Sequence, residues 1–177
     1  MPHLLFPTPI GSCGLAWNEA GLTAFVLPGR DQAETEAWLE RLAGADRTAI
    51  SIEAAPAWVC ARIGQVQRHL AGELQDFTGV PLDFERVAHF ARRVYEAART
   101  VPAGQTRTYG DLAAMLAEPP GSSRAIGALL GANPWPLIVP CHRIIGAKGR
   151  LTGFSSVGGV RLKARLLAIE GAQLLAE

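Results

Sequence analysis

Residues 108–133 read TYGDLAAMLAEPPGSSRAIGALLGAN, and this stretch decides how the second half of the chain is organised. Thr108, with Asp111 three residues later, comes close to a capping box and predicts the start of a helix. The letters EPPGSS break that helix, and Ser122 or Ser123 can cap a second one that ends near the following Gly-Ala-Asn. Two short helices joined by a tight break are typical of a helix-turn-helix, although many helical hairpins with this pattern bind nothing.

The charged side chains are divided unevenly between the two halves of the chain. The net charge is only +1, but residues 1–85 hold five basic and eleven acidic side chains, whereas residues 86–177 hold twelve and five. The halves therefore carry net charges of −6 and +7. A basic half of this size can face phosphates, which favours DNA as the partner of the helix pair. Chance clustering of solvated charge would give the same asymmetry, so the charge alone does not decide.

Length and composition limit the class of protein. A chain of 177 residues that is 49% hydrophobic and 19% charged can form one globular domain or two small ones. It has no apolar run of the length that spans a membrane, and its N-terminus lacks the features of a signal peptide. Three widely spaced cysteines argue for reduced thiols rather than disulfides. We therefore expect a cytoplasmic protein without a membrane span.

The first half predicts a small α/β module. The segments CGLAWN and GLTAFVL flank a turn-rich stretch and predict an antiparallel hairpin. The preceding LLFPTPIG is expected to add a strand at the edge of the sheet, because of its prolines. Residues 31–44 show helical spacing at Ala37, Trp38 and Leu42, and a second amphipathic helix begins at Pro56.

The second half is predicted to be mostly helical. It has a helix over residues 86–100, the helix pair, a loop rich in Gly and Ser, and a final helix from about Val160 to Ile169. The expected fold class is therefore α/β, with residues 1–85 and 86–177 as two domains.

The letters VPCHRII, residues 139–145, place a thiol, an imidazole and a guanidinium in a row. A cysteine nucleophile needs a base or a nearby positive charge to become a thiolate. On an extended strand neighbouring side chains point to opposite faces, so contact between Cys141 and His142 needs a turn or a bridging water. Pro140 is expected to break the strand, and Glu170 is a candidate to orient His142. A Cys141 that only packs in the core is an equally good interpretation of these residues alone.

A metal site is not expected. Cys141 and His142 are adjacent and cannot easily share a tetrahedral site, and no C-x-x-C or H-x-x-x-H spacing accompanies them. The spacing of the other candidate ligands matches no site either, and packed cysteines are far more common. These other candidates are Cys13, Cys60, His3, His69 and His89.

Several motifs, in order, resemble those of the O6-alkylguanine-DNA alkyltransferases, also called methylated-DNA–protein-cysteine methyltransferases. PCHRI (140–144) is similar to the active-site motif of this family, and VPAGQTRTYGDLA (101–113) to the segment that leads into its helix-turn-helix. SRAIGALLGANP (123–134) resembles its recognition helix, and GFSSVGG with KARLLAIEG (163–171) resembles its binding loop and final helix. The resemblance covers residues 101–171. The N-terminal part is only loosely similar to the ribonuclease-H-like domain of the family.

The resemblance implies a DNA-repair enzyme that acts once. Such a protein has a ribonuclease-H-like α/β N-terminal domain and a mostly helical C-terminal domain with a helix-turn-helix and an active-site loop. It would flip O6-alkylguanine, and also O4-alkylthymine, out of duplex DNA and transfer the alkyl group irreversibly to its own cysteine. The expected partner is double-stranded DNA that contains O6-alkylguanine, bound by a monomer, and no cofactor, metal or membrane is expected.

The family's catalytic roles can be carried over residue by residue. The resemblance implies that Cys141 accepts the alkyl group, that His142 deprotonates it through a water, and that Glu170 holds His142. Tyr109 would contact the phosphate beside the flipped nucleotide and protonate the departing guanine. Asn133 would stabilise the turn that carries the active-site segment.

The same comparison implies how the helix pair meets DNA. Arg124 would enter the duplex and fill the place of the flipped base, because a planar guanidinium can replace lost stacking. Ser122, Ser123 and Gly127 are small, and would let the recognition helix approach the DNA closely through the minor groove.

The base pocket is the part that departs most from the family. Val139, Phe154 and Ser155 are expected to line it, but Phe154 stands where some members have Tyr, and the SSV letters lengthen the binding loop.

Two other functions stay open at this point. One is a non-catalytic module that flags alkylated bases for other repair, although relatives of that kind replace the cysteine. The other is a plain helix-turn-helix regulator.

Overall fold

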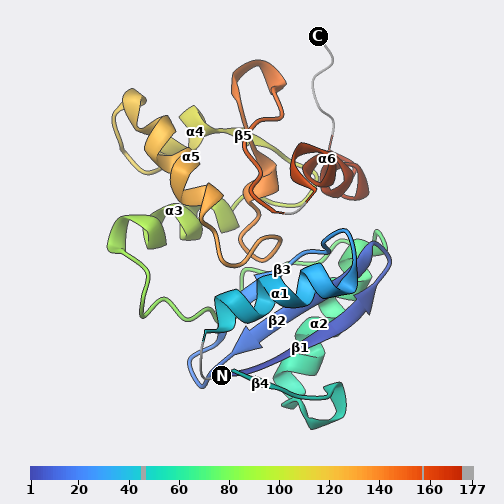
Figure 1. The fold of residues 1–177 in the computed structure, drawn as a ribbon. Coiled ribbons are helices and arrows are strands. Elements are labelled where there is room, and N and C mark those ends of the chain that lie inside the picture. The colour runs from blue at the N-terminus through green and yellow to red at the C-terminus, as the bar shows by residue number, and fades with distance from the viewer. Residues whose placement is uncertain (45–46, 157, 173–177) are drawn as a thin grey trace.

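The computed structural model describes residues 1–44, 47–156 and 158–172 of the chain. Figure 1 shows a four-stranded sheet with two helices in one part and mainly helices and loops in the other, which agrees with the predicted α/β class. Within these ranges no helix is long and apolar enough to cross a membrane. Val157 of the predicted binding loop and residues 173–177 lie outside the described residues.

The sheet has the strand order β3-β2-β1-β4. Strand β2 (Gly11–Trp17) pairs antiparallel with both β1 (Pro2–Thr8) and β3 (Leu22–Val26), and its pairing with β3 confirms the predicted hairpin. The short β4 (Thr48–Ala49) pairs in parallel with the start of β1. Only Pro2 and His3 therefore have a strand on both sides, and the predicted edge position is confirmed for the LLFPTPIG segment, which begins at Leu4.

Strand β1 tolerates its prolines because β4 is so short. β4 pairs only with Pro2 and His3. From Leu4 onward β1 pairs with β2 alone, and Pro7, which has no backbone N–H to donate, lies in that part.

Helices α1 (Gln32–Ala43) and α2 (Ala57–Leu70) cover opposite faces of the sheet, as Figure 1 shows. The buried side chains of α1 form a small cluster with β2 and β3, whereas those of α2 belong to the main core cluster. Because both faces are covered, β2 is buried continuously from Cys13 to Trp17 instead of alternating.

Helix α1 begins and ends where the sequence predicts, between the cap residues Asp31 and Gly44, but it buries a different face. Its buried residues are Thr35, Leu39 and Ala43. Leu42, from the predicted apolar set, is 41% exposed. Gly14 of β2 explains the choice, because a Cβ at that position would lie only 2.7 Å from Cδ2 of Leu39.

The second half is built around α3 (His89–Arg99), α4 (Tyr109–Met115) and α5 (Ser123–Gly131), which pack against one another. The predicted capping box is confirmed, since Thr108 and Asp111 each accept a hydrogen bond from the backbone N–H of the other. Two 3₁₀ turns, η1 (Ile52–Ala54) and η2 (Pro120–Ser122), precede α2 and α5.

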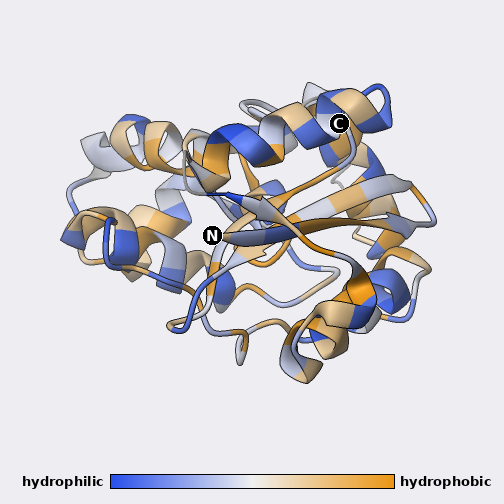
Figure 2. Ribbon diagram, turned by 60° about the horizontal axis from the view of Figure 1, so that its bottom comes forward, coloured by the Kyte–Doolittle hydropathy of each residue, from blue (hydrophilic) through white to orange (hydrophobic). Residues whose placement is uncertain are grey.

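The edge strand β3 holds the segment that leads to VPCHRII. The backbone N–H of Phe25 donates to the carbonyl of Pro134 (2.8 Å), and the indole N–H of Trp135 donates to the carbonyl of Leu22 (2.9 Å). The main buried cluster runs from the sheet and α2 into the second half. Figure 2 shows the same pattern, with apolar residues concentrated between the elements and hydrophilic ones on outward helix faces. The sheet is therefore part of the scaffold of the VPCHRII segment.

Candidate active site

The segment VPCHRII forms a tight turn rather than a strand. Residues Cys141–Arg143 make a single 3₁₀ turn, η3, and the short strand β6 (Ile144–Ile145) follows it. Pro140 leads into the turn with ψ of 64°, in agreement with the predicted break. A 3₁₀ helix has about three residues per turn, so the three side chains leave the backbone at different angles, although those of His142 and Arg143 both reach Glu170.

Asn133 closes the loop before this turn. Its side-chain N–H donates to the carbonyl of Val139 (2.9 Å), and its Oδ1 accepts from the backbone N–H of Trp135 (2.9 Å). Leu137 lies inside the loop with φ of 79°, which is a strained conformation for a leucine, and its side chain is fully buried. These contacts fix the backbone immediately before Cys141.

A short parallel pairing brings Tyr109 to the same region. Strand β5 (Arg107–Thr108) pairs with β6, and Tyr109 begins α4 directly after β5. The Tyr109 hydroxyl donates to the carbonyl of Thr152 (3.3 Å). Burial raises the pKa of this hydroxyl, and the negative charge that Cys141 can carry acts in the same direction. The phenol therefore keeps its proton near neutral pH and is a hydrogen-bond donor there.

Glu170 follows the final helix, α6 (Gly159–Ile169), and is buried against η3. Its Oε1 lies 2.9 Å from Nε2 of His142, 3.0 Å from Nε2 of His69 and 2.8 Å from Nη2 of Arg143. Burial alone would raise the pKa of this carboxyl. Hydrogen bonds from His142, His69 and Arg143 outweigh burial and hold the pKa well below its usual range. Glu170 is therefore an anion shared by three side-chain donors, and the backbone N–H of Gly104 approaches its other oxygen at 3.5 Å.

The second ring nitrogen of His142 is free to accept a proton. His142 Nδ1 is buried and has no hydrogen-bond partner among the residues that the structure describes. Burial lowers the pKa of His142, and its hydrogen bond with Glu170 opposes that change only in part. A neutral ring that donates from Nε2 to Glu170 keeps its lone pair on Nδ1.

Lys163 places a positive charge near the thiol. It is fully buried on α6, and its Nζ donates to the carbonyls of Ile144 (2.6 Å) and Thr152 (3.0 Å). Burial lowers the pKa of Lys163 to about 8. Burial also raises the pKa of Cys141, while a hydrogen bond with Asn133 and the charge of Lys163 oppose that rise. These two neighbours favour the thiolate form of Cys141.

The predicted DNA-contacting residues lie at the start of α5. Ser122 is the N-cap residue, but its side chain makes no capping hydrogen bond, while Ser123 opens the helix and Arg124 is exposed. Gly127 lies near the ring of Tyr109, because a Cβ added there would be 3.6 Å from Cε1 of that ring. The middle of α5 and Tyr109 are therefore neighbours.

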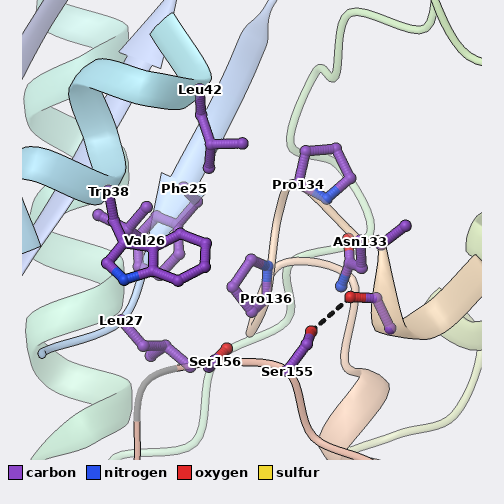
Figure 3. A pocket seen from close by; sticks show the side chains of 12 residues that line it. Phe25, Val26, Leu27, Trp38, Leu42, Asn133, Pro134, Pro136, Ser155 and Ser156 are labelled. Carbon is purple, nitrogen blue, oxygen red and sulfur yellow. Dashed lines mark hydrogen bonds between the residues drawn. The ribbon is translucent and has the colours of Figure 1, made fainter.

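The three residues predicted to line a base pocket differ from one another in burial and in the groups that they contact. Val139 is fully buried, Phe154 packs against the main core, and Ser155 is exposed and donates from its hydroxyl to the carbonyl of Gly131. Figure 3 shows Ser155 in a pocket of about 220 Å³, lined largely by apolar side chains of β3 and α1 and by the loop after α5. Cys141 does not line this pocket.

Two residues of the site were not predicted from the sequence. Lys163 lies seven residues before Glu170, and that spacing puts both on one face of a helix, so it was a usable signal. From the sequence alone, His69 is only a candidate metal ligand. It lies 101 residues before Glu170, and no local pattern connects the two. Among the described residues, no group of three or more His, Cys, Asp or Glu side chains could hold a metal ion.

Known proteins share this fold and these motifs. Residues 89–172 match the family model described as 6-O-methylguanine DNA methyltransferase, DNA binding domain. A methylated-DNA–protein-cysteine methyltransferase of Methanosarcina acetivorans is 36% identical over 173 residues, 97% of this chain and 99% of that protein. One from Mycolicibacterium paratuberculosis is 45% identical over 108 residues, 61% of this chain, and the match spans only 62% of that relative's length. The crystal structure of Mycobacterium tuberculosis OGT in complex with DNA is similar with a TM-score of 0.76 at 34% identity, covering 97% of this chain and 93% of that one.

The family model covers η3, α4 and α5, and the archaeal relative matches nearly from end to end. This chain therefore belongs to the family of methylated-DNA–protein-cysteine methyltransferases.

Proposed function

We propose that this protein repairs DNA by transferring an alkyl group from O6 of guanine, and also from O4 of thymine, to the sulfur of Cys141. The observation that carries the proposal is the η3 turn, where the thiol precedes His142 and Nε2 of His142 lies 2.9 Å from the buried Glu170. A thiol nucleophile needs a nearby base that is held in orientation. The names of the relatives and the DNA complex of the mycobacterial protein support the same reaction.

The proposed reaction needs no cofactor. His142 Nδ1 takes the thiol proton through a bridging water, and Glu170 stabilises the imidazolium that forms. The thiolate attacks the alkyl carbon, a sulfur–carbon bond forms, and the bond between that carbon and O6 breaks with its electron pair left on guanine. Tyr109 gives its proton to the guanine ring, so that a neutral base leaves, and the phenolate regains a proton from solvent. The thioether is stable, so each molecule reacts once.

We further propose how the chain is divided and how it meets DNA. Helices α4 and α5 act as a helix-turn-helix that enters the minor groove, with Ser122, Ser123 and Gly127 at the contact and Arg124 in the place of the flipped base. Residues 1–85 act as a ribonuclease-H-like domain and residues 86–177 as the DNA-binding alkyltransferase domain.

We propose that the protein works as a monomer in the cytoplasm, with Val139, Phe154 and Ser155 around the flipped base. All three cysteines are free thiols in the structure, which fits a reducing compartment.

Mass spectrometry tests the proposed reaction. The protein is incubated with duplex DNA that contains O6-methylguanine and is then digested. One added methyl group is expected on the peptide that holds Cys141. Cys13, whose pKa burial raises to about 12, and the half-buried Cys60 serve as internal controls and should stay unmodified. Lesion-selective binding without a methylated Cys141 would contradict the proposal and favour a non-catalytic binding module.

Arg124→Ala is expected to slow transfer from duplex DNA by about tenfold, which corresponds to about 1.4 kcal/mol of lost stacking. Transfer from the free alkylated base should change by less than about twofold, because no gap in a base stack has to be filled. Single-turnover rates with both substrates measure the difference. Arg47→Ala, which removes an exposed arginine from the acidic half, is the matched control. Equal slowing on both substrates would argue against a role for Arg124 inside the duplex.

A further inference from the structure

We infer that His69, on helix α2 in the first half of the chain, is a positioning residue for alkyl transfer. It donates from Nε2 to the oxygen of Glu170 that also holds His142, and so limits how strongly Glu170 retains the His142 proton. This role rests on the proposed function, in which His142 acts as the base for Cys141.

The tautomer of His69 is set by its other ring nitrogen. The backbone N–H of Gln75 donates to Nδ1 (3.1 Å), so Nδ1 carries no proton and the ring proton lies on Nε2. Nε2 lies 3.0 Å from Oε1 of Glu170 and therefore donates to it. The ring is 1% exposed and packs against Phe77 with ring centroids 5.1 Å apart. His69 is thus locked as a donor to the carboxylate.

Two imidazoles share a single carboxylate oxygen. A carboxylate oxygen that accepts several hydrogen bonds spreads its charge among the donors, so each added donor weakens its hold on the others. Burial lowers the pKa of His142 most, Glu170 opposes this, and Arg143 and His69 lower the pKa further. His69 therefore keeps His142 neutral, and able to take the thiol proton, to a lower pH than it otherwise would be.

Other charged groups surround the pair and stay in place when His69 is changed. Arg143 reaches the same carboxylate from η3, and Cys141 lies at the start of that turn. Lys163 faces the thiol from α6, and Asp76, in the segment after α2, acts on Arg143 through its charge. A change in pH dependence after substitution of His69 alone would therefore report the loss of its own hydrogen bond.

The test compares transfer rates of the wild type, His69→Phe and His69→Gln across pH. Phenylalanine keeps a ring against Phe77 but has no donor, whereas the glutamine amide offers an N–H close to the position of Nε2 and does not titrate. Loss of the His69 donor raises the pKa of His142, so His142 becomes protonated at a higher pH than in the wild type. Transfer by His69→Phe should therefore be about three- to tenfold slower than wild-type transfer at the acidic end of the profile, about pH 6. At about pH 8 the same variant should stay within about twofold of the wild type. His69→Gln should stay within about twofold at both values.

If the wild type is alkylated but His69→Phe is slowed equally at both pH values, His69 only supports the fold. That result would overturn the positioning role and leave the proposed function standing. A wild type that is never alkylated overturns the proposed function and this role with it. Nitrogen-15 NMR of the wild type supplies a measurement that needs no variant. The His69 signals should show an unprotonated Nδ1, and a protonated Nδ1 would overturn the inference even if the variants fail to fold.

Discussion

Cys141→Ser is expected to abolish alkyl transfer, with a rate at least about 10³-fold below that of the wild type. The thiol of Cys141 has a base, His142, in the same turn and the charge of Lys163 nearby, and both favour the thiolate. A serine hydroxyl in that position is a far weaker acid and stays protonated. Single-turnover transfer from an O6-methylguanine duplex measures the loss, and affinity for the same duplex should change by less than about twofold.

Cys13→Ser is the matched control for this substitution. It makes the same change at a fully buried thiol in β2. Both variants should lose about 1–3 kcal/mol of unfolding free energy, because a hydroxyl is buried in place of a thiol. Only the change at Cys141 should remove transfer. A serine variant at Cys141 that transfers within tenfold of the wild type would show that another group accepts the alkyl group.

Glu170→Gln is expected to destabilise the fold and to slow transfer together. The carboxylate is the buried partner of Arg143, with contacts at 2.8 Å and 3.0 Å, and an amide leaves that guanidinium charge uncompensated. Breaking a buried ion pair from one side costs about 3–5 kcal/mol of unfolding free energy. The rate should fall by about 10²–10⁴-fold, because His142 loses the anion that orients it and stabilises its protonated form.

The effect of Glu170 on stability should depend on pH with a definite sign. The pKa of Glu170 is depressed in the folded state, so its contribution is present above the pKa of an unfolded glutamate, about 4.3, and is lost as pH falls below that value. Urea unfolding should therefore show that the wild type has a higher free energy of unfolding than Glu170→Gln, with the largest difference near neutral pH and a smaller one in acid. Glu96→Gln removes an exposed acid paired with Arg92 and should cost less than about 1 kcal/mol. A constant difference across pH would contradict the buried anion.

The elements that follow from short-range chemistry could be predicted from the sequence. The capping box of Thr108 and Asp111 involves residues three apart, and the boundaries of α1 at Asp31 and Gly44 are equally local. The β2–β3 hairpin and the break at Pro140 belong to the same class. In each case the atoms that decide the conformation lie within one turn of the chain.

The features that were missed depend on residues far apart in the sequence. The short strand β4 was not predicted and pairs with Pro2 and His3, 46 residues earlier, and the buried face of α1 is set by the close approach of Gly14 to Leu39. The single 3₁₀ turn at Cys141 lies beyond a loop that Asn133 closes. His69 meets Glu170 only because the packed core brings α2 and η3 together. Periodicity and composition carry no information about such encounters.

The carboxylate of Glu170 also links the two halves of the chain, because His69 lies in the first half and His142 and Arg143 lie in the second. Because α2 and η3 both place side chains at this one group, a chain without the imidazole at position 69 leaves the same oxygen with one donor fewer. The first half supplies none of the groups that are proposed to react. A hybrid that takes its sheet and its first two helices from another protein would therefore keep the contact with Glu170 only if a donor at position 69 came with them.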